Sequence, residues 1–208
     1  AAPTAMAQAC AMLNIPLVHI SSDYVFDGLG SRPFSPQDAT APQNVYGQSK
    51  LGGEQGISES GCNYAILRTS WVFSTHGSNF VKKILQISQN CNELNVIVDQ
   101  VGGPTSAKAI AAACLKIVNQ MLVNPGKSGI YHFSGAPNVS WCDFARVILM
   151  EAGRKVQVNG VLTCDYPTPA SRPLNSRLDC SLTEQTFNLI RPNWCQDLAT
   201  VIKKLEFY

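Results

Sequence analysis

The stretch at residues 17–22 is Leu17-Val18-His19-Ile20-Ser21-Ser22, a short and mostly apolar run that ends in two hydroxyl side chains. Its length and its β-branched residues predict a buried strand. After a segment rich in proline and glycine at 27–44, residues 45–59 predict a helix and residues 64–68 predict a second strand. Strands that alternate with helices form a parallel sheet. Catalytic groups of such sheets lie at the carboxyl ends of the strands, which is where Ser22 falls.

The rest of the chain continues this alternation. Helices are expected up to about Leu13, over 79–89, 107–122, 182–188 and 194–205, and after a cap formed by Ser140 with Asp143. Further strands are expected at 94–98 and 129–133. The pattern predicts an α/β protein without internal repeats. The loop at 27–44 is long, and loops of that length in compact domains usually have a function.

Tyr46 and Lys50 are four residues apart, so on the predicted helix they lie one turn apart on the same face. A lysine ammonium in that position stabilises the ionised phenol and orients it. A phenol with a reference pKa of about 10 needs such help to act as an acid near neutral pH. Ser22 would hydrogen-bond the same substrate oxygen from the end of the neighbouring strand. The pair alone could also be an exposed helical feature, because Tyr-x-x-x-Lys is common by chance.

Five ordered segments supply the missing context. They are Ile20-Ser21-Ser22-Asp23-Tyr24-Val25-Phe26-Asp27-Gly28, Pro42-Gln43-Asn44-Val45-Tyr46-Gly47-Gln48-Ser49-Lys50-Leu51-Gly52-Gly53-Glu54, Arg68-Thr69-Ser70-Trp71-Val72-Phe73, Asp99-Gln100-Val101-Gly102-Gly103-Pro104-Thr105 and Tyr166-Pro167-Thr168-Pro169-Ala170-Ser171-Arg172-Pro173. Together they resemble the extended short-chain dehydrogenase/reductases, and among these the bacterial dTDP-4-dehydrorhamnose reductases. The resemblance covers almost the whole chain.

The fold implied by the resemblance is a partial Rossmann-like, doubly wound parallel sheet with a smaller C-terminal substrate-binding α/β region. Residues 1–72 would form the second half of the dinucleotide-binding domain and hold the active site. Residues 73–95 and 124–208 would form mainly the substrate-binding region. Residues 96–123 would return to the Rossmann-like domain.

The activity implied by the resemblance is reduction of the C4 ketone of dTDP-4-dehydro-L-rhamnose to dTDP-L-rhamnose. The hydride would come from NADPH or NADH, in the last step of dTDP-rhamnose synthesis for cell-surface polysaccharides. Tyr46 would protonate the forming alkoxide, Ser22 would polarise the carbonyl, and Lys50 would hold the cofactor ribose. The same resemblance assigns Ser21 and Ser70, with Tyr46 and Lys50, to cofactor binding.

Two other functions fit the same residues. One is another nucleotide-sugar reductase or epimerase of this family, and the other is a homologous, non-catalytic regulatory subunit. The intact set of Ser22, Tyr46 and Lys50 favours the enzyme.

Four residues have both a structural and a substrate-binding interpretation. Asp23 could cap a turn or, by resemblance, hydrogen-bond the sugar. Trp71 could be ordinary core or lie against the sugar and the nicotinamide. Arg172 could be a loop cation, although an arginine flanked by prolines suits bidentate recognition of a nucleotide diphosphate. Asn79 is expected to cap a helix, with a nucleotide contact as the alternative.

A glycine-rich phosphate-binding turn is absent from the sequence. Reductases of this kind begin with a strand, a glycine-rich turn and a helix that holds the cofactor pyrophosphate. Gly52-Gly53 falls inside a predicted helix, and Gly102-Gly103-Pro104 lacks the required spacing. We therefore expect the chain to be a fragment that lacks roughly eighty residues of a mononucleotide-binding half. Such a fragment should bind NADPH poorly.

Composition predicts a soluble cytoplasmic domain. Sixteen basic and fourteen acidic residues leave a net charge of +2, which gives no indication of nucleic-acid or membrane binding. The sequence contains no apolar run of membrane-spanning length and no signal peptide. The eight cysteines are scattered without a C-x-x-C pair, which favours reduced thiols over disulfides or zinc ligands.

Lys108 bears on assembly. Relatives from some bacteria pair through a magnesium ion held by glutamates, and one of these glutamates corresponds to Lys108. An ammonium group only donates and cannot bind magnesium. We therefore expect no metal site and no magnesium-bridged dimer, while a homodimer formed by ordinary contacts stays an alternative.

Overall fold

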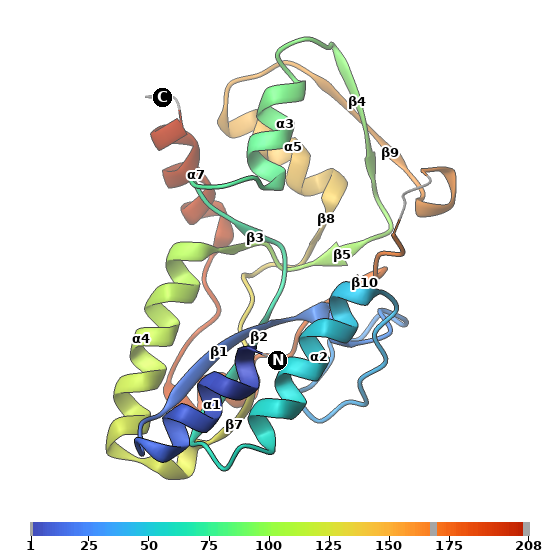
Figure 1. Ribbon diagram of the computed structural model, residues 1–208. Coiled ribbons are helices and arrows are strands. Elements are labelled where there is room, and N and C mark those ends of the chain that lie inside the picture. Colours follow the sequence, from blue (N-terminus) through green and yellow to red (C-terminus); the bar gives the residue numbers. More distant parts are fainter. Residues whose placement is uncertain (1, 167–169, 206–208) are drawn as a thin grey trace.

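The computed structural model describes residues 2–166 and 170–205, which form two regions stacked one on the other (Figure 1). The first region is a three-stranded parallel sheet in the order β1-β2-β7. Its strands are β1 (Leu17–Ser22), β2 (Tyr64–Thr69) and β7 (Gly129–His132). The register places Ser22 beside Thr69 at the carboxyl ends. The predicted α/β fold with a parallel sheet is confirmed.

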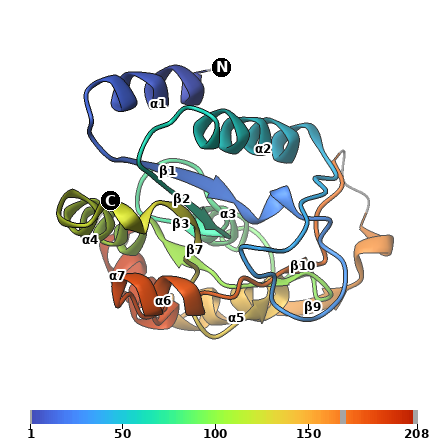
Figure 2. The ribbon, with the colours of Figure 1, turned by 90° about the horizontal axis from the view of Figure 1, so that it is seen from below.

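Helices cover both faces of this sheet, as Figure 2 shows. On one face, α1 (Ala2–Met12) and α2 (Val45–Ser58) pack against each other and against β1. On the opposite face lies α4 (Ala107–Val123), and α6 (Ser181–Phe187) packs against β7 and α4. The buried residues of α4 recur at helical spacing, so one stripe of the helix faces the sheet. The sheet is therefore doubly wound.

The strand residues alternate between these two layers. Ala65 and Leu67 belong to the apolar cluster that includes α4, whereas Ile66 belongs to the cluster that includes α1 and α2. Successive side chains of a strand point to opposite faces, so a run that is apolar throughout is buried on both sides. This accounts for the apolar sequence that predicted β2.

A buried ion pair fixes α2 on the sheet. Arg68 in β2 donates to both carboxylate oxygens of Glu54 in α2, at 2.9 Å and 2.6 Å, and both side chains are 2% exposed. Loss of one partner would leave an uncompensated buried charge, which typically costs about 3–5 kcal/mol. The pair therefore holds the helix that carries Tyr46 against the strand that leads to Trp71.

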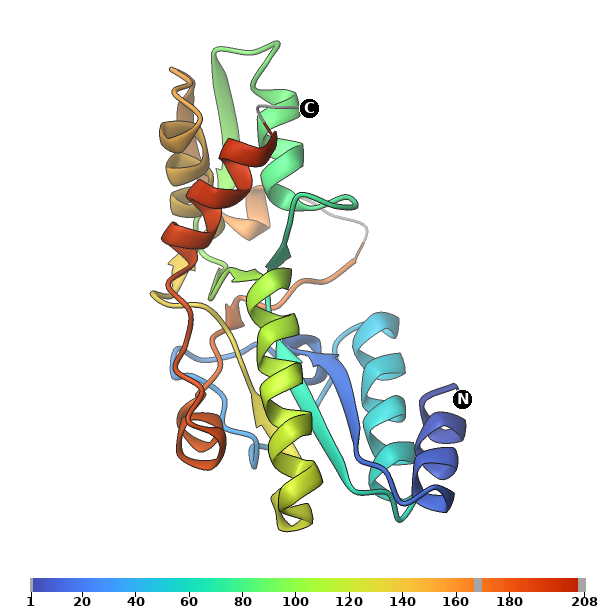
Figure 3. The same cartoon turned by 90° about the vertical axis from the view of Figure 1, so that its left-hand side faces the viewer.

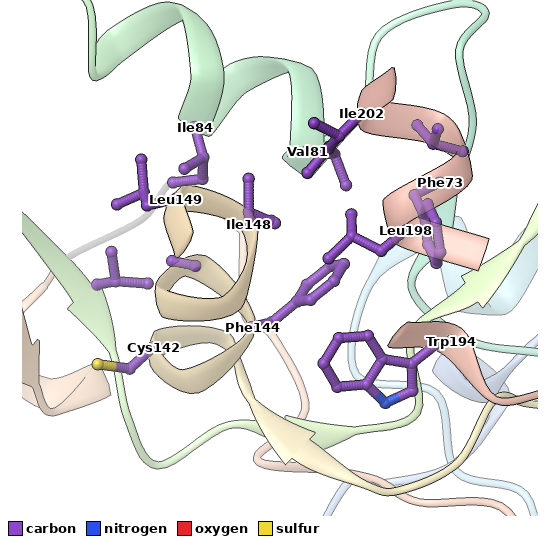
Figure 4. Close-up of a cluster of buried hydrophobic side chains, with 13 residues drawn as sticks. Phe73, Val81, Ile84, Cys142, Phe144, Ile148, Leu149, Trp194, Leu198 and Ile202 are labelled. Carbon is purple, nitrogen blue, oxygen red and sulfur yellow. The ribbon is translucent and has the colours of Figure 1, made fainter. Parts of the chain in front are cut away.

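The second region contains three helices and a two-stranded parallel sheet. The helices are α3 (Phe80–Ile87), α5 (Trp141–Glu151) and α7 (Trp194–Leu205), and the strands are β4 (Glu93–Ile97) and β9 (Gln157–Val161). Figure 4 shows its core, in which Phe144, Leu198 and Trp194 are almost completely buried. The hydroxyl of Ser140 accepts from the Asp143 amide at 3.0 Å, so the predicted cap of α5 is confirmed.

Short strands and turns connect the two regions. They are η1 (Asp23–Val25), β3 (Val72–Phe73), β5 (Val101–Gly102), β6 (Thr105–Ser106), η2 (Pro125–Lys127), β8 (Val139–Ser140), η3 (Thr163–Asp165) and β10 (Asn175–Ser176). The sheets they form are β10-β5-β8 and β3-β6. None of these short strands was predicted, and neither was β9.

The expected domain boundaries need adjustment. Residues 124–208 were expected to form mainly the substrate-binding region, yet β7 and α6 come from this range and lie with the first sheet (Figure 3). Residues 96–97 were expected in the Rossmann-like domain, yet they end β4 of the second region. The reason is topological, because a parallel strand can join the sheet only after a crossover. Here α4 precedes β7 and supplies the helix of that crossover.

The loop at 27–44 is ordered by contacts with residues 173–179. The Phe34 amide donates to Arg177 O at 2.9 Å, and the Asp179 amide donates to Phe34 O at 2.8 Å. At Gly28 the φ angle is +73°, and a Cβ there would lie 2.3 Å from Pro173 Cβ. Only glycine fits this turn. The loop thereby joins the two regions beside the carboxyl ends of β1 and β2.

Candidate active site

Ser22 is the last residue of β1, and its hydroxyl is oriented by its neighbours. Ser22 Oγ accepts a hydrogen bond from the Tyr24 amide at 3.2 Å and donates one to Asp23 Oδ1 at 3.0 Å. It therefore caps the short helix η1 that follows the strand. The turn-capping role considered for Asp23 thus belongs to Ser22.

Tyr46 and Lys50 lie one turn apart on α2, as predicted. The Lys50 ammonium lies 5.9 Å from the centroid of the Tyr46 ring and donates to Ile20 O at 3.3 Å, so it sits between the helix and the end of β1. Tyr46 is 52% exposed, and the ring of Tyr24 meets it edge-on at 5.4 Å. The phenol is therefore held by an aromatic neighbour but reachable from outside.

Gly47 brings α2 close to η1. A Cβ at this position would lie 2.2 Å from Tyr24 O, so no larger residue fits without a backbone shift. The helix begins with the cap Asn44, whose Oδ1 accepts from the Gly47 amide at 2.9 Å. The cap and the close approach together place Tyr46 on the same side of the fold as Ser22.

A cavity of about 840 Å³ opens between these elements. Its walls include Ser22, Tyr46, Lys50, Trp71 and Arg172. They also include three other predicted site residues and several that were not predicted: Ser21, Asp23, Ser70, Tyr24, Gln43, Asn44, Val45, Thr69 and Ser171. The structure thus brings together all the predicted site residues except Asn79.

Asp23 is a buried carboxylate on the wall of this cavity. Burial raises its pKa to about 6, and hydrogen bonds from Ser176 and Ser22 only partly offset that shift. Asp23 Oδ2 has no hydrogen-bond partner among the described residues. A carboxylate kept in this state, with one oxygen free, is suited to accept a hydrogen bond from a ligand hydroxyl.

Two more hydroxyl groups on the cavity wall lack partners in the described part of the chain. They are Ser21 Oγ and Thr69 Oγ1, both buried. Buried polar groups are normally paired, so unpaired groups in a cavity indicate a polar ligand or water there. Ser70 differs, because its hydroxyl donates to Gly103 O at 2.9 Å and keeps only acceptor capacity.

Trp71 and Arg172 form the part of the wall nearest the second region. Trp71 has a φ angle of +51° and stacks on Trp141, with ring centroids 3.5 Å apart and planes at 8°. Next to exposed Arg172, Ser171 O accepts from Asn44 Nδ2 at 2.9 Å, which links this segment to the start of α2. Pro167, Thr168 and Pro169, which belong to the segment used for the resemblance, lie outside the described residues.

A match to a family model covers residues 1–207, and the model is described as the RmlD substrate binding domain. The chain belongs to the dTDP-4-dehydrorhamnose reductase family. A reductase of this name from Sinorhizobium fredii is 45% identical over 91% of the chain and 66% of its own length. The chain thus spans about two thirds of the length of this relative.

Solved structures of dTDP-4-dehydrorhamnose reductases have the same fold. The enzyme from Clostridium acetobutylicum matches with a TM-score of 0.91 and 35% identity, over 98% of this chain and 71% of that one. The enzyme from Bacillus anthracis, solved in complex with NADP, matches with a TM-score of 0.86 and 31% identity, over 97% and 70%. These relatives confirm the family that the ordered motifs indicated.

Asn79 is the one predicted site residue outside the catalytic cavity. Its Oδ1 accepts from the Lys82 amide at 3.2 Å, and its Nδ2 donates to Ser74 O at 2.8 Å. Asn79 therefore caps α3, as expected. With both polar atoms engaged, its side chain has little capacity left for a nucleotide.

A second cavity of about 790 Å³ lies in the substrate-binding region of the reductase fold. Arg172 lines both cavities. The second has aromatic walls, Phe80, Trp141 and Tyr166, over an apolar floor that includes Ile84 and Val96. The sequence gave no signal for this cavity, because its walls come from four elements far apart in the chain.

Thr69 is the residue that sequence reasoning could have found. It is the last residue of β2, and the register pairs it with Ser22. Because the carboxyl ends of neighbouring parallel strands meet at one edge, a hydroxyl at that position was a candidate for the site.

No helix within residues 2–166 and 170–205 combines the length and the apolarity that a membrane crossing requires. The same residues contain no cluster of three or more His, Cys, Asp or Glu side chains suited to a metal ion.

Proposed function

We propose that the chain carries out the reduction for which its family is named, the conversion of dTDP-4-dehydro-L-rhamnose to dTDP-L-rhamnose with NADPH. The observation that carries the proposal is the convergence of Ser22, Tyr46 and Lys50 on one cavity. Three separate elements supply these groups and the cavity wall around them: the end of β1, the first turns of α2 and the end of β2.

The cavity suits a nicotinamide cofactor. Lys50 offers a cation beside the sheet, and the unpaired hydroxyl of Ser21 offers a hydrogen bond from the same strand end. Tyr46 and Ser70, also on the cavity wall, complete the group proposed to contact the cofactor. When bound, the reduced nicotinamide supplies the hydride for the ketone.

Protonation of the reduced carbonyl falls to Tyr46. The phenol gives its proton to the oxygen as the ketone becomes an alkoxide, and the ammonium of Lys50 stabilises the phenolate left behind. Ser22 donates a hydrogen bond to the same oxygen. It carries only one proton, so its bond to Asp23 Oδ1 must break for that donation. Asp23 then has an acceptor free for a sugar hydroxyl.

The rest of the substrate extends toward the second region. Arg172 lines both cavities, so it is placed to bind the diphosphate between the sugar and the nucleoside. The second cavity, with its aromatic and apolar walls, suits the thymidine. Trp71 would form the platform for the sugar, as the resemblance implied.

We further propose that the protein works in the cytoplasm and that any homodimer forms without bridging magnesium. Lys108 supports the second point, because it is an exposed residue in the first turn of α4 and offers no oxygen ligand.

The direct test is oxidation of NADPH driven by dTDP-4-dehydro-L-rhamnose. We expect steady oxidation that depends on the sugar nucleotide, and slower or no oxidation with 4-keto sugars carried by UDP. Equal rates with UDP-linked sugars would favour another reductase of this fold. The absence of oxidation, together with the absence of binding to dTDP-L-rhamnose, would contradict the proposal.

A further inference from the structure

The backbone of Trp71 does not by itself fix where its indole lies. Its φ angle of +51° is in the left-handed region, which bulky residues rarely adopt. A residue in such a conformation is held by its surroundings. The position of the indole on the cavity wall must therefore be set by the groups that touch it.

One of these groups is Trp141. Its ring lies parallel to Trp71, with centroids 3.5 Å apart and an interplanar angle of 8°. Phe80 of α3 braces Trp141 in turn, with centroids 4.4 Å apart. The indole of Trp71 is thus supported by two further aromatic rings from the second region.

The other group is Gly102. A Cβ at this position would lie 2.8 Å from Cε2 and 2.9 Å from Nε1 of Trp71. The indole therefore occupies the space that any other side chain at 102 would fill. Gly102 has no positive φ angle that requires glycine, so the close approach of the indole is what requires it here.

Gly102 and Trp141 belong to one hydrogen-bonded unit. Gly102 pairs with Val139 in the antiparallel ladder of β5 and β8, and the Trp141 amide donates to Gln100 O at 3.3 Å. A shift of one therefore shifts the other. We call Gly102 and Trp141 the Trp71 socket.

We propose that the Trp71 socket positions Trp71, and that it thereby sets the affinity of the catalytic cavity for the sugar nucleotide. This inference rests on the proposed function. Trp141 also lines the second cavity, so it could instead contact the nucleoside directly. The two roles predict different results when Trp71 is already absent.

Circular dichroism tests the geometry without any ligand. Two stacked indoles couple their electronic transitions and give a paired positive and negative band. We expect this signal to disappear in Trp71→Phe and in Trp141→Phe, and to weaken in Gly102→Ala. The matched control is Trp194→Phe, which removes the third tryptophan from the core of α7 and should retain the signal. A signal that survives Trp141→Phe would overturn the socket.

Calorimetric titration with dTDP-L-rhamnose tests the consequence. Trp141→Ala should raise the Kd about tenfold, the effect expected when an aromatic platform loses its support. Trp141→Phe, which keeps a flat ring against Trp71, should restore most of the affinity. Gly102→Ala approaches the socket from the other side and should also weaken binding, so the test does not depend on one variant folding.

A double-mutant cycle separates the two roles of Trp141. If Trp141 acts through Trp71, then Trp71→Ala/Trp141→Ala should bind as weakly as Trp71→Ala alone. Additive losses would show that Trp141 contacts the ligand itself and would overturn the proposal. If the unmodified chain bound no dTDP-L-rhamnose, the proposed function would fail, and the dichroism of the variants would still decide whether the socket exists.

Discussion

Tyr46 is half exposed on the wall of the cavity, with Lys50 beneath its ring and Tyr24 against its edge. A proton donor needs this combination, because it must reach the substrate and yet be held in one orientation. We expect Tyr46→Phe to lower the turnover of NADPH oxidation by at least about a hundredfold, since a general acid typically contributes 10²–10⁴. Binding of dTDP-L-rhamnose, measured by calorimetry, should change little.

A tyrosine remote from the cavity provides the control. The hydroxyl of Tyr131 in β7 donates to Lys127 O at 2.7 Å, and Tyr131→Phe should leave turnover unchanged. Near-normal turnover in Tyr46→Phe with cofactor binding intact would assign the proton to another group. Lys50→Met should lose both rate and cofactor affinity, because Lys50 is given two roles.

Asp23 lowers the stability of the fold at neutral pH. Its pKa is about 6 when folded and 3.8 in an unfolded reference, so the folded state binds the proton more tightly. Its favourable contribution is therefore complete below about pH 4 and is lost as the pH rises to about 6. A shift of two units corresponds to an order of 3 kcal/mol. Such a cost is expected where a buried group serves a ligand.

Asp23→Asn tests this account by removing the charge while keeping the shape. We expect the free energy of unfolding of Asp23→Asn to exceed that of the unmodified protein by up to about 3 kcal/mol at pH 7. The difference should shrink between pH 6 and pH 4, and affinity for the sugar nucleotide should fall. Urea titrations at several pH values would measure the first effect. A difference that did not vary with pH would show that the carboxylate is not destabilised by burial.

At the scale of elements, α2 decides the geometry of the site, and two of its glycines provide a matched pair. Gly47 lies against η1, where a Cβ would meet Tyr24 O at 2.2 Å, whereas a Cβ at Gly52 would meet nothing within 4 Å. Both lie inside the same helix, so both substitutions gain the same helix propensity.

We expect Gly52→Ala to stabilise the protein by about 0.5–1 kcal/mol and to leave turnover unchanged. Gly47→Ala should destabilise it by about 1–3 kcal/mol, because the backbone must move. It should also lower turnover, since the neighbouring residue is Tyr46. Thermal unfolding and NADPH oxidation measure the two effects. Equal behaviour of the two variants would show that α2 can shift without cost to the site.

The elements that carried periodic patterns could be predicted from the sequence. The apolar run of β2 and the spaced apolar residues of α4 identified their layers. The short strands β5 and β8 could not be predicted, because two residues have no period. The sequence of β9, Gln157-Val158-Asn159-Gly160-Val161, contains glycine and polar residues that disfavour strands, and only its pairing with β4 makes it one.

The candidate site was predictable to a similar degree. Ser22, Tyr46 and Lys50 lie close together because strand ends and helix faces follow simple geometry. The burial of Asp23 and the support of Trp71 by Trp141 arise from packing between residues far apart in the chain. No local pattern in the sequence reports such contacts.

At the scale of the whole molecule, the two regions share the site. The first supplies the proton donor and the strand ends, and the second supplies the aromatic cavity lined by Trp141. The hydrogen bond from Asn44 to Ser171 O connects them at the rim. A sugar nucleotide that spans both cavities would bind the two regions at once, with Arg172 at the junction.

Arg172→Lys tests whether one ligand spans the two cavities. A guanidinium binds a diphosphate through a rigid fork, which an ammonium replaces by a single point charge. We expect the Kd for dTDP-L-rhamnose to rise about tenfold, since hydrogen bonds to charged groups contribute about 1.5–3 kcal/mol. The affinity for free L-rhamnose or thymidine, which lack the diphosphate, should not change. As a control, Arg177→Lys alters an arginine that bonds Asn175 at 3.0 Å and lines neither cavity, so it should have no effect. Equal losses with the diphosphate-free ligands would instead mean that Arg172 only shapes the rim. Unchanged affinity in Arg172→Lys would place the diphosphate elsewhere, and the two cavities would then serve separate ligands.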